Sequence, residues 1–242
     1  LTSFNEWNGN ISPLPAVEHK SQSNEITTAC HDLFFSYTGD RDLFNAFNMK
    51  IDDFRAFGIT GSNGCGKTTL AKLLLHIERS ESGSITLTKA GEKAAMAYLE
   101  QFPEKMIGAD SLDSFVQRLV TAGKLDKYKI NHAVKNLKNC QLEWEQIKYK
   151  TALDLPWSTL RVVLTIWLLN SEYDLLILDE PTFGLGRQQV LTLTHHLRLY
   201  LKNKNLIIIS HDTEFIYTFC DRVFEMDQHT IITEKNNITS NG

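Results

Sequence analysis

The sequence has no long hydrophobic run, few cysteines and no excess of basic residues. Its densest apolar stretch, Val162 to Leu169, is far shorter than the roughly 18–20 residues that a helix needs to cross a bilayer. We therefore expect neither direct insertion into a membrane nor a signal peptide in this sequence. The four cysteines lie far apart and show no CxxC spacing, a pattern that favours reduced thiols in a cytosolic protein.

The charge balance also excludes a class of partner. The chain carries 25 basic and 29 acidic residues and a net charge of −4, and this balance disfavours a protein that binds a nucleic-acid backbone. We expect no nucleic-acid partner. With 242 residues, of which 42% are hydrophobic, the chain is long enough to bury the core of one domain or of a domain with a subdomain.

The first residues differ in composition from the rest. Residues 1 to about 25 are rich in Ser, Asn and Pro, and we interpret residues 1–28 as a flexible arm or linker before a folded domain over residues 29–242. The chain begins at Leu1 rather than Met, which suggests a fragment of a longer protein, such as the second half of a tandem one.

Strand and helix patterns alternate at both ends of the domain. Short apolar runs such as 175–178 are typical of strands buried on both faces, and residues 103–162 carry helical patterning without strong strands. This order predicts an α/β fold with a helical subdomain over about 103–162. The expected strands are 29–37, 55–60, 84–88, 175–178 and 206–209, and the expected helices include 70–77 and 190–201.

A glycine-rich segment after the second expected strand fits G-x-x-x-x-G-K-S/T without a gap. Glycines allow backbone N–H groups to turn inward around phosphates, and a helix that begins there directs its positive end at the same anion. Lys67 is expected to reach the β- and γ-phosphates of ATP, and Thr68 to bind Mg²⁺. The candidate nucleotide-binding residues are Gly61, Ser62, Asn63, Gly64, Cys65, Gly66, Lys67, Thr68 and Thr69.

Two alternatives concern this loop. A chance glycine-rich turn is disfavoured, because the motif has the strand–loop–helix context that it requires. Within the loop, Cys65 is interpreted as a small filler whose backbone matters more than its sulfur, while a redox-sensitive thiol remains the other interpretation.

Two acids follow the apolar run 175–178. A strand end beside a phosphate-binding loop places Asp179 where it can hold Mg²⁺, and Glu180 where it can polarise an attacking water. Solvated acids that merely end a strand are the alternative, which the paired loop motif disfavours.

Together these residues resemble the ATP-binding-cassette (ABC) family, from Ala29 to about Asp227. The resemblance implies a P-loop NTPase of RecA-like type, with a mixed-sheet core, N-terminal antiparallel strands and a helical subdomain insert. It implies that Tyr37 stacks on adenine, that Gln101 is a Q-loop residue that reaches Mg²⁺ and the water, and that His211 contacts the γ-phosphate. A core-facing aromatic and a structural histidine are the alternatives for Tyr37 and His211.

A finer resemblance concerns the segments Gln101 to Val116 and Asp179 to Leu185. Both are similar to ATPases of energy-coupling-factor importers. That similarity implies a peripheral ATPase at the cytoplasmic face of the cell membrane, which works with integral membrane transporter subunits that choose the substrate.

One family motif is replaced. Where the family has Leu-Ser-Gly-Gly-Gln/Glu, this chain has Leu155 to Thr159, and Gly186 stands where the family usually has Asp. In the family's head-to-tail dimer this signature covers the partner's ATP. Pro156 has no N–H to offer and Trp157 would crowd a phosphate. We therefore expect an asymmetric dimer with a second ABC ATPase domain, either in a heterodimer or in a tandem chain.

Two other functions compete with this interpretation. A soluble ABC protein of DNA repair or translation is disfavoured, because the chain shows neither sustained heptads nor a strongly basic arm. A module that binds ATP without hydrolysis is disfavoured by the presence of Glu180 and His211. Co-purification with an integral membrane subunit would separate transport from both.

Overall fold

The computed structural model describes residues 26–37, 42–52, 54–201, 204–228 and 230–232. Most of the predicted arm over residues 1–28 lies outside these ranges. The first strand begins at Ile26 rather than at the expected Ala29.

An antiparallel sheet opens the fold. Its strands have the order β2-β1-β4-β5 among the described residues. Buried and exposed residues alternate along much of β1, as expected for a sheet with one face on the core and one in water. The strand bounds are β1 Ile26–Ser36, β2 Asp42–Ile51, β4 Ser82–Lys89 and β5 Glu92–Lys93.

A second sheet forms the centre of the molecule, with the order β10-β9-β3-β8-β7-β6 within the described part of the chain. Its neighbouring strands run parallel, apart from the antiparallel β9–β10 pair. Every residue of β3, β7 and β8 is buried, because both faces of this sheet are covered. The bounds are β3 Ala56–Thr60, β6 Met96–Leu99, β7 Leu175–Asp179, β8 Asn205–Ile209, β9 Arg222–Glu225 and β10 Thr230–Ile232.

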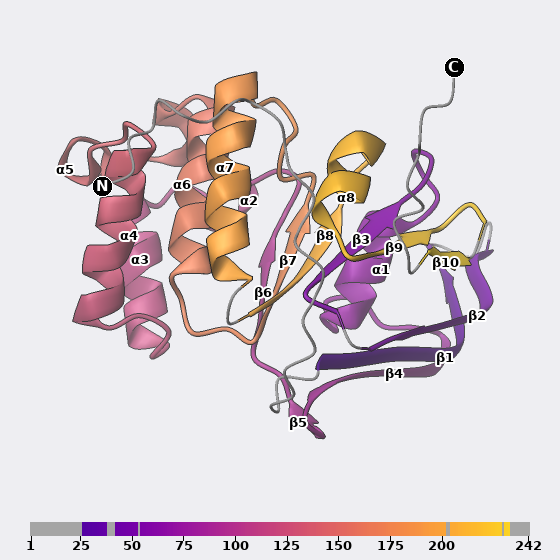
Figure 1. The fold of residues 1–242 in the computed structure, drawn as a ribbon. Helices are drawn as coiled ribbons and strands as arrows, with labels where there is room; N and C mark the ends of the chain where they lie inside the picture. Colours follow the sequence, from indigo (N-terminus) through magenta and orange to yellow (C-terminus); the bar gives the residue numbers. More distant parts are fainter. Residues whose placement is uncertain (1–25, 38–41, 53, 202–203, 229, 233–242) are drawn as a thin grey trace, which may run out of the picture.

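Helices cover the two faces of the central sheet. Helix α1 lies between the two sheets, whereas α6, α7 and α8 lie on the opposite face, and α3, α4 and α5 lie farther out beyond α6 (Figure 1). The bounds are α1 Lys67–Leu74, α2 Glu104–Ile107, α3 Leu112–Thr121, α4 Lys127–Asn139, α5 Trp144–Ile147, a 3₁₀ helix Ala152–Asp154, α6 Trp157–Leu169, α7 Arg187–Tyr200 and α8 Thr213–Phe219.

Successive side chains of β7 point to opposite faces of the sheet and pack into two separate hydrophobic cores. Leu175 and Ile177 pack with α1 and the antiparallel sheet, whereas Leu176 and Leu178 pack with α6, α7, α8 and the outer helices. This follows from the two-residue repeat of a strand. The outer helices join the second core, where the Trp167 ring lies 4.8 Å from that of Trp144.

The predicted α/β fold with N-terminal antiparallel strands and a helical insertion is confirmed. The exact limits of the helical subdomain, about 103–162, remain a prediction. No helix within the described ranges has the length and apolarity that a bilayer crossing requires. All four cysteines are free thiols.

Close packing of α8 on β3 gives a test of the fold. A Cβ atom at Gly58 would lie 2.7 Å from Ile216 Cγ2 and 3.1 Å from Cys220 Sγ. We expect Gly58→Ala to lower the free energy of unfolding by roughly 1–3 kcal/mol through overpacking, as measured by urea denaturation. A Cβ atom at Gly186 would lie no closer than 3.8 Å to its nearest neighbour, so Gly186→Ala serves as the control and should change stability by less than about 1 kcal/mol. Equal effects of the two variants would contradict the packing argument.

Candidate functional site

The predicted phosphate-binding loop joins β3 to α1. Gly61, Gly64 and Gly66 have φ angles of 149°, 83° and 104°, a backbone region that side chains disfavour, so the loop needs glycine at these positions. Gly66 is the N-cap of α1 and provides no side-chain cap. The first N–H groups of α1 are therefore available to an anion, and the positive end of the helix dipole favours one.

Lys67 lies against this loop. Its Nζ donates hydrogen bonds to the carbonyl oxygens of Gly61, at 2.8 Å, and of Ser62, at 2.9 Å. The side chain is largely buried. A positive charge is thus held beside the glycine-rich turn. The thiol of Cys65 is half-buried, and burial raises its pKa, which argues against a reactive thiolate.

One carboxylate oxygen of Asp179 accepts hydrogen bonds from two hydroxyl groups. Its Oδ2 accepts hydrogen bonds from Thr68 Oγ1 at 2.7 Å and from Tyr98 Oη at 3.0 Å. Burial raises the pKa of Asp179, while the bonds from Thr68 and Tyr98 act in the opposite direction. Burial also raises the pKa of Tyr98, so this side chain stays a neutral donor. The hydroxyl of Thr68 and the carboxylate are hard oxygen ligands, which Mg²⁺ prefers.

Glu180 is held from three sides at the end of β7. Its carboxylate accepts hydrogen bonds from Ser210 Oγ at 2.8 Å and from the backbone N–H of His211 at 2.9 Å, and His211 Nδ1 lies 2.8 Å from Glu180 Oε1. The residue is buried and has a φ of 51°, which is unusual for a residue other than glycine. The structure thus brings Glu180 and His211, two of the three predicted catalytic residues, into direct contact, whereas the third, Gln101, is not part of this contact.

Arg161 is a functional candidate that the sequence prediction missed. It is 1% exposed, and its guanidinium donates hydrogen bonds to the backbone oxygens of Gln101, at 2.7 Å, and of Glu180. Burial lowers the pKa of Arg161, and the nearby acids Glu180 and Asp179 oppose this shift. Arg161 is the one charged residue of α6. A single charge in an otherwise uncharged helix was the sequence feature that could have identified it as a functional candidate. Tyr98 and Ser210 were missed as well, because nothing in their local sequence marks a contact with an acid.

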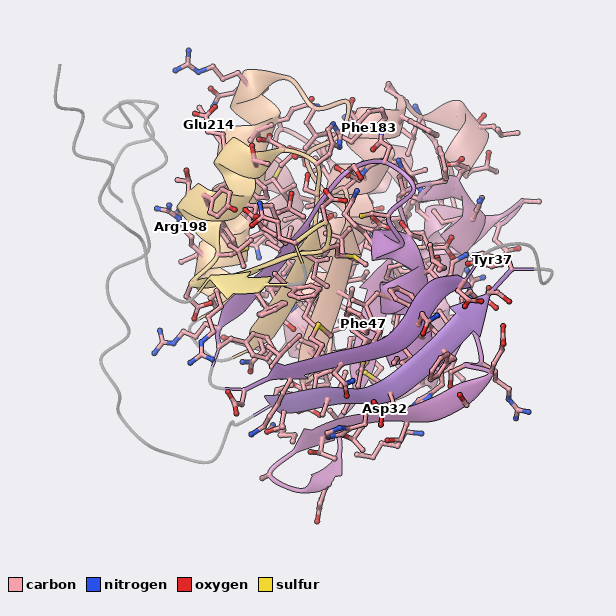
Figure 2. All side chains as sticks on the ribbon, turned by 90° about the vertical axis from the view of Figure 1, so that its right-hand side faces the viewer. Asp32, Tyr37, Phe47, Phe183, Arg198 and Glu214 are labelled. Atoms are coloured by element: carbon pink, nitrogen blue, oxygen red, sulfur yellow. The ribbon has the colours of Figure 1, made fainter. Side chains whose placement is uncertain are left out.

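Tyr37 and Gln101 lie near the loop and the acids, but no hydrogen bond between described residues joins their side chains to Asp179 or Glu180. Tyr37 follows β1, is 48% exposed, and its hydroxyl lies 3.2 Å from Thr69 Oγ1. Figure 2 shows Tyr37 at the end of the antiparallel sheet, whereas Phe47 points from that sheet toward the core. The Tyr37 side chain therefore does not face the core. Gln101 lies just beyond β6, and among the described residues no hydrogen bond brings its side chain to Asp179 or Glu180.

The segment Leu155 to Thr159, predicted to stand in place of the family signature, lies at the start of α6. Pro156 is the N-cap of this helix and makes no side-chain cap, and Trp157 is 40% exposed. The Trp157 ring lies 5.4 Å from that of Phe102, which follows Gln101 in the chain. Gly186 is the N-cap of α7, and its N–H donates to Gln189 Oε1 at 3.1 Å.

The residues present fit a magnesium nucleotide. A glycine-rich turn, a helix N-terminus and the Lys67 ammonium suit the phosphates, and the pair of Thr68 and Asp179 suits the metal ion. Glu180 follows Asp179 at the end of β7, and it pairs with the imidazole of His211, which lies just after the neighbouring strand β8. This arrangement has the parts needed to bind a nucleoside triphosphate and to activate a water.

Comparison with known proteins gives a consistent result. A family model described as ABC transporter matches residues 44–183. An ABC transporter ATP-binding protein of Treponema denticola is 26% identical over 240 residues, which are 96% of this chain and 47% of that protein. The ATP-binding protein ZnuC of the high-affinity zinc uptake system of Bacillus subtilis is 23% identical over 209 residues, covering 81% of this chain and 89% of that protein.

Among solved structures, cbiO1 from Clostridium perfringens, part of the ABC transporter complex cbiONQ, is 25% identical with a TM-score of 0.66. The match covers 85% of this chain and 86% of that one. It confirms the predicted P-loop NTPase fold. This chain spans less than half of the Treponema denticola relative.

The Tyr98–Asp179 contact can be tested directly. Tyr98→Phe removes a donor to the carboxylate, so the pKa of Asp179, already raised by burial, should rise further. We also expect a loss of about 1–2 kcal/mol in the free energy of unfolding. This loss should be present at neutral pH and disappear in acid, where Asp179 is protonated in both the folded and the unfolded chain.

Carbon-13 NMR titration of the aspartate carboxyls and urea unfolding at two pH values would measure both effects. Tyr128→Phe is the control, because Tyr128 is 78% exposed. An unchanged Asp179 titration in Tyr98→Phe would show that the contact does not stabilise the carboxylate.

Proposed function

The chain belongs to the ABC transporter family, and from this membership we propose that it is the ATP-binding and ATP-hydrolysing subunit, or half, of a transporter. The observation that carries the proposal is the convergence of the Lys67 loop, the Thr68–Asp179 pair and the Glu180–His211 pair at one edge of the central sheet.

Binding of ATP would rest on the loop from Gly61 to Thr69. Its backbone N–H groups and those at the start of α1 would surround the phosphates, and Lys67 would pair with the β- and γ-phosphates. Tyr37, exposed beside Thr69, is proposed to stack on the adenine ring.

The metal would be held by Thr68 and Asp179, with Gln101 as a further proposed ligand. When bound, Mg²⁺ would neutralise charge on the phosphates. Burial raises the pKa of Asp179, and a cation at this position would act in the opposite direction and favour the ionised form. Tyr98 would keep the carboxylate oriented while Thr68 turns to the metal.

Hydrolysis would depend on Glu180 and His211. The Glu180 carboxylate, buried and oriented by Ser210 and by the backbone of His211, is proposed to polarise the attacking water. The His211 ring, next to this carboxylate, is proposed to contact the γ-phosphate. Arg161 would bind the backbone oxygens of both Glu180 and Gln101, and it would thereby fix the positions of these two residues relative to each other.

The start of α6 supports an asymmetric dimer with a second ABC ATPase domain. Pro156 offers no N–H at the helix N-terminus, and the exposed Trp157 ring leaves little room for a phosphate. The site completed by this segment would therefore be weak, while the chain's own loop and acids would form a strong site with a partner's signature. A heterodimer or a tandem protein would provide this division of labour.

An importer of the energy-coupling-factor type is supported by two similarities: to cbiO1, part of an ABC transporter complex, and to ZnuC, of a zinc uptake system. Under this proposal the chain would dock on integral membrane subunits at the cytoplasmic face of the membrane. Those subunits would select the transported substrate.

A binding experiment tests the nucleotide site. We expect the chain to bind Mg-ATP in equilibrium titration and Lys67→Ala to bind at least tenfold more weakly, because the ammonium that faces the loop is lost. Lys135→Ala is the control, since Lys135 lies on the exposed side of α4. If Lys67→Ala and the unaltered chain gave the same titration, the proposed site would be refuted.

A turnover experiment tests the division of labour. The isolated chain should show low ATPase activity, and mixing with its partner ATPase should raise it. Glu180→Gln should then reduce turnover by at least a hundredfold while leaving ATP binding intact, because the acid no longer polarises water. Glu214→Gln, an exposed change on α8, is the control.

Two results would oppose this proposal. Turnover that survives Glu180→Gln nearly unchanged would show that the strong site lies elsewhere. Robust hydrolysis by the chain alone, rising with its own concentration, would show that two copies of the replaced signature suffice.

A further inference from the structure

A carboxylate far from the loop in sequence binds the second residue of the loop. Asp227 lies in the turn after β9, and its Oδ2 and Oδ1 accept hydrogen bonds from the backbone N–H and from the hydroxyl of Ser62, both at 2.7 Å. The backbone continues the same junction, because Met226 N–H donates to the carbonyl of Thr60 at 2.9 Å. The residues after β9 thus form hydrogen bonds with the end of β3, at Thr60, and with the start of the loop, at Ser62.

The space around this junction is tight. A Cβ atom at Gly61 would lie 2.9 Å from Cys65 Sγ, 3.2 Å from Met226 Cβ and 3.3 Å from Asp227 Oδ2. Gly61 therefore packs between Cys65 of the same loop and the two residues that follow β9, Met226 and Asp227. Glycine is required at this position both by the lack of space and by its φ of 149°.

Ser62 connects this contact with the lysine. Its N–H and hydroxyl bind Asp227, while its carbonyl oxygen accepts a hydrogen bond from Lys67 Nζ at 2.9 Å. All the polar groups of this loop residue form hydrogen bonds, two with the exposed Asp227 carboxylate and one with the Lys67 ammonium. A shift of Ser62 would therefore move the position at which Lys67 is held.

We propose that Asp227 is a positioning residue for nucleotide binding, which fixes the entry of the phosphate-binding loop through Ser62. This inference rests on the proposed function of the loop. A loop that is already ordered loses less conformational entropy when it binds a ligand, so binding is tighter.

The charge of Asp227 acts against this benefit. The hydrogen bonds from Ser62 lower the pKa of Asp227, so the carboxylate is ionised at neutral pH and repels a triphosphate. Loss of the hydrogen bonds of Asp227 should weaken nucleotide binding, whereas loss of its negative charge should strengthen it. Two substitutions of Asp227 separate these effects.

Equilibrium titration with Mg-ATP is the test. Asp227→Ala removes both hydrogen bonds and should weaken binding about fivefold to tenfold, the size expected for such bonds. Asp227→Asn can accept from the Ser62 N–H and donate to its hydroxyl, so it keeps both bonds without the charge and should bind at least as tightly as the unaltered chain. In the partner-activated enzyme, Asp227→Ala should raise KM and leave kcat within about twofold.

Two further variants test the path through Ser62. Ser62→Ala removes one of the two bonds and should give a smaller loss, and in the double variant with Asp227→Ala the losses should not add, because both changes break the same contact. Asp126→Ala is the matched control: Asp126 accepts from the backbone N–H and from Nζ of Lys129, both at 2.8 Å, at the start of α4. It should leave nucleotide binding unchanged.

The outcomes are distinct. Binding by Asp227→Ala equal to or tighter than that of the unaltered chain overturns the inference while the proposed function stands, and so does Asp227→Asn binding as weakly as Asp227→Ala. If the unaltered chain binds no Mg-ATP, both the inference and the proposed function fail. Urea unfolding of each variant shows whether a weaker titration reflects loss of folded protein, in which case rescue by Asp227→Asn at equal stability decides for positioning.

Discussion

The site depends on how Glu180 is held at the end of β7. Its carboxylate meets Ser210 and His211 at the end of β8, and its backbone oxygen accepts a hydrogen bond from Arg161 of α6. A φ of 51° costs free energy in a residue other than glycine, so these contacts must outweigh that cost. One residue thereby joins two strands of the central sheet to the helix that packs on it, and its side chain has little freedom left.

This arrangement follows from the strand order. In the parallel sheet β3, β8 and β7 are neighbours, and the register pairs Asp179 with Ile209, which places Glu180 beside Ser210. Parallel neighbours end at the same edge, so the loop after β3 and the acids after β7 meet there. Two apolar cores, one on each face of the sheet, fix the strands and therefore the positions of these ends.

The sequence predicted the parts of this site that are local. The loop Gly61 to Thr69 and the apolar run before Asp179 carry their own signals, and both elements form as expected, although α1 begins at Lys67 rather than at Leu70. The parts that were missed depend on contacts between distant segments. No pattern around Tyr98 or Asp227 indicates that the first meets Asp179 and the second meets Ser62, because strand order decides both.

The start of α6 shows how one helix can keep its structural role where its family motif is replaced. Trp157 lies at the exposed end, where a substitution disturbs little packing, whereas Arg161, about one turn later, is buried against Gln101 and Glu180. Loss of the motif therefore does not require loss of the helix's contacts with the chain's own acids. In the proposed asymmetric dimer, the same helix would position Glu180 for the chain's own site and yet offer a poor surface to a partner's nucleotide.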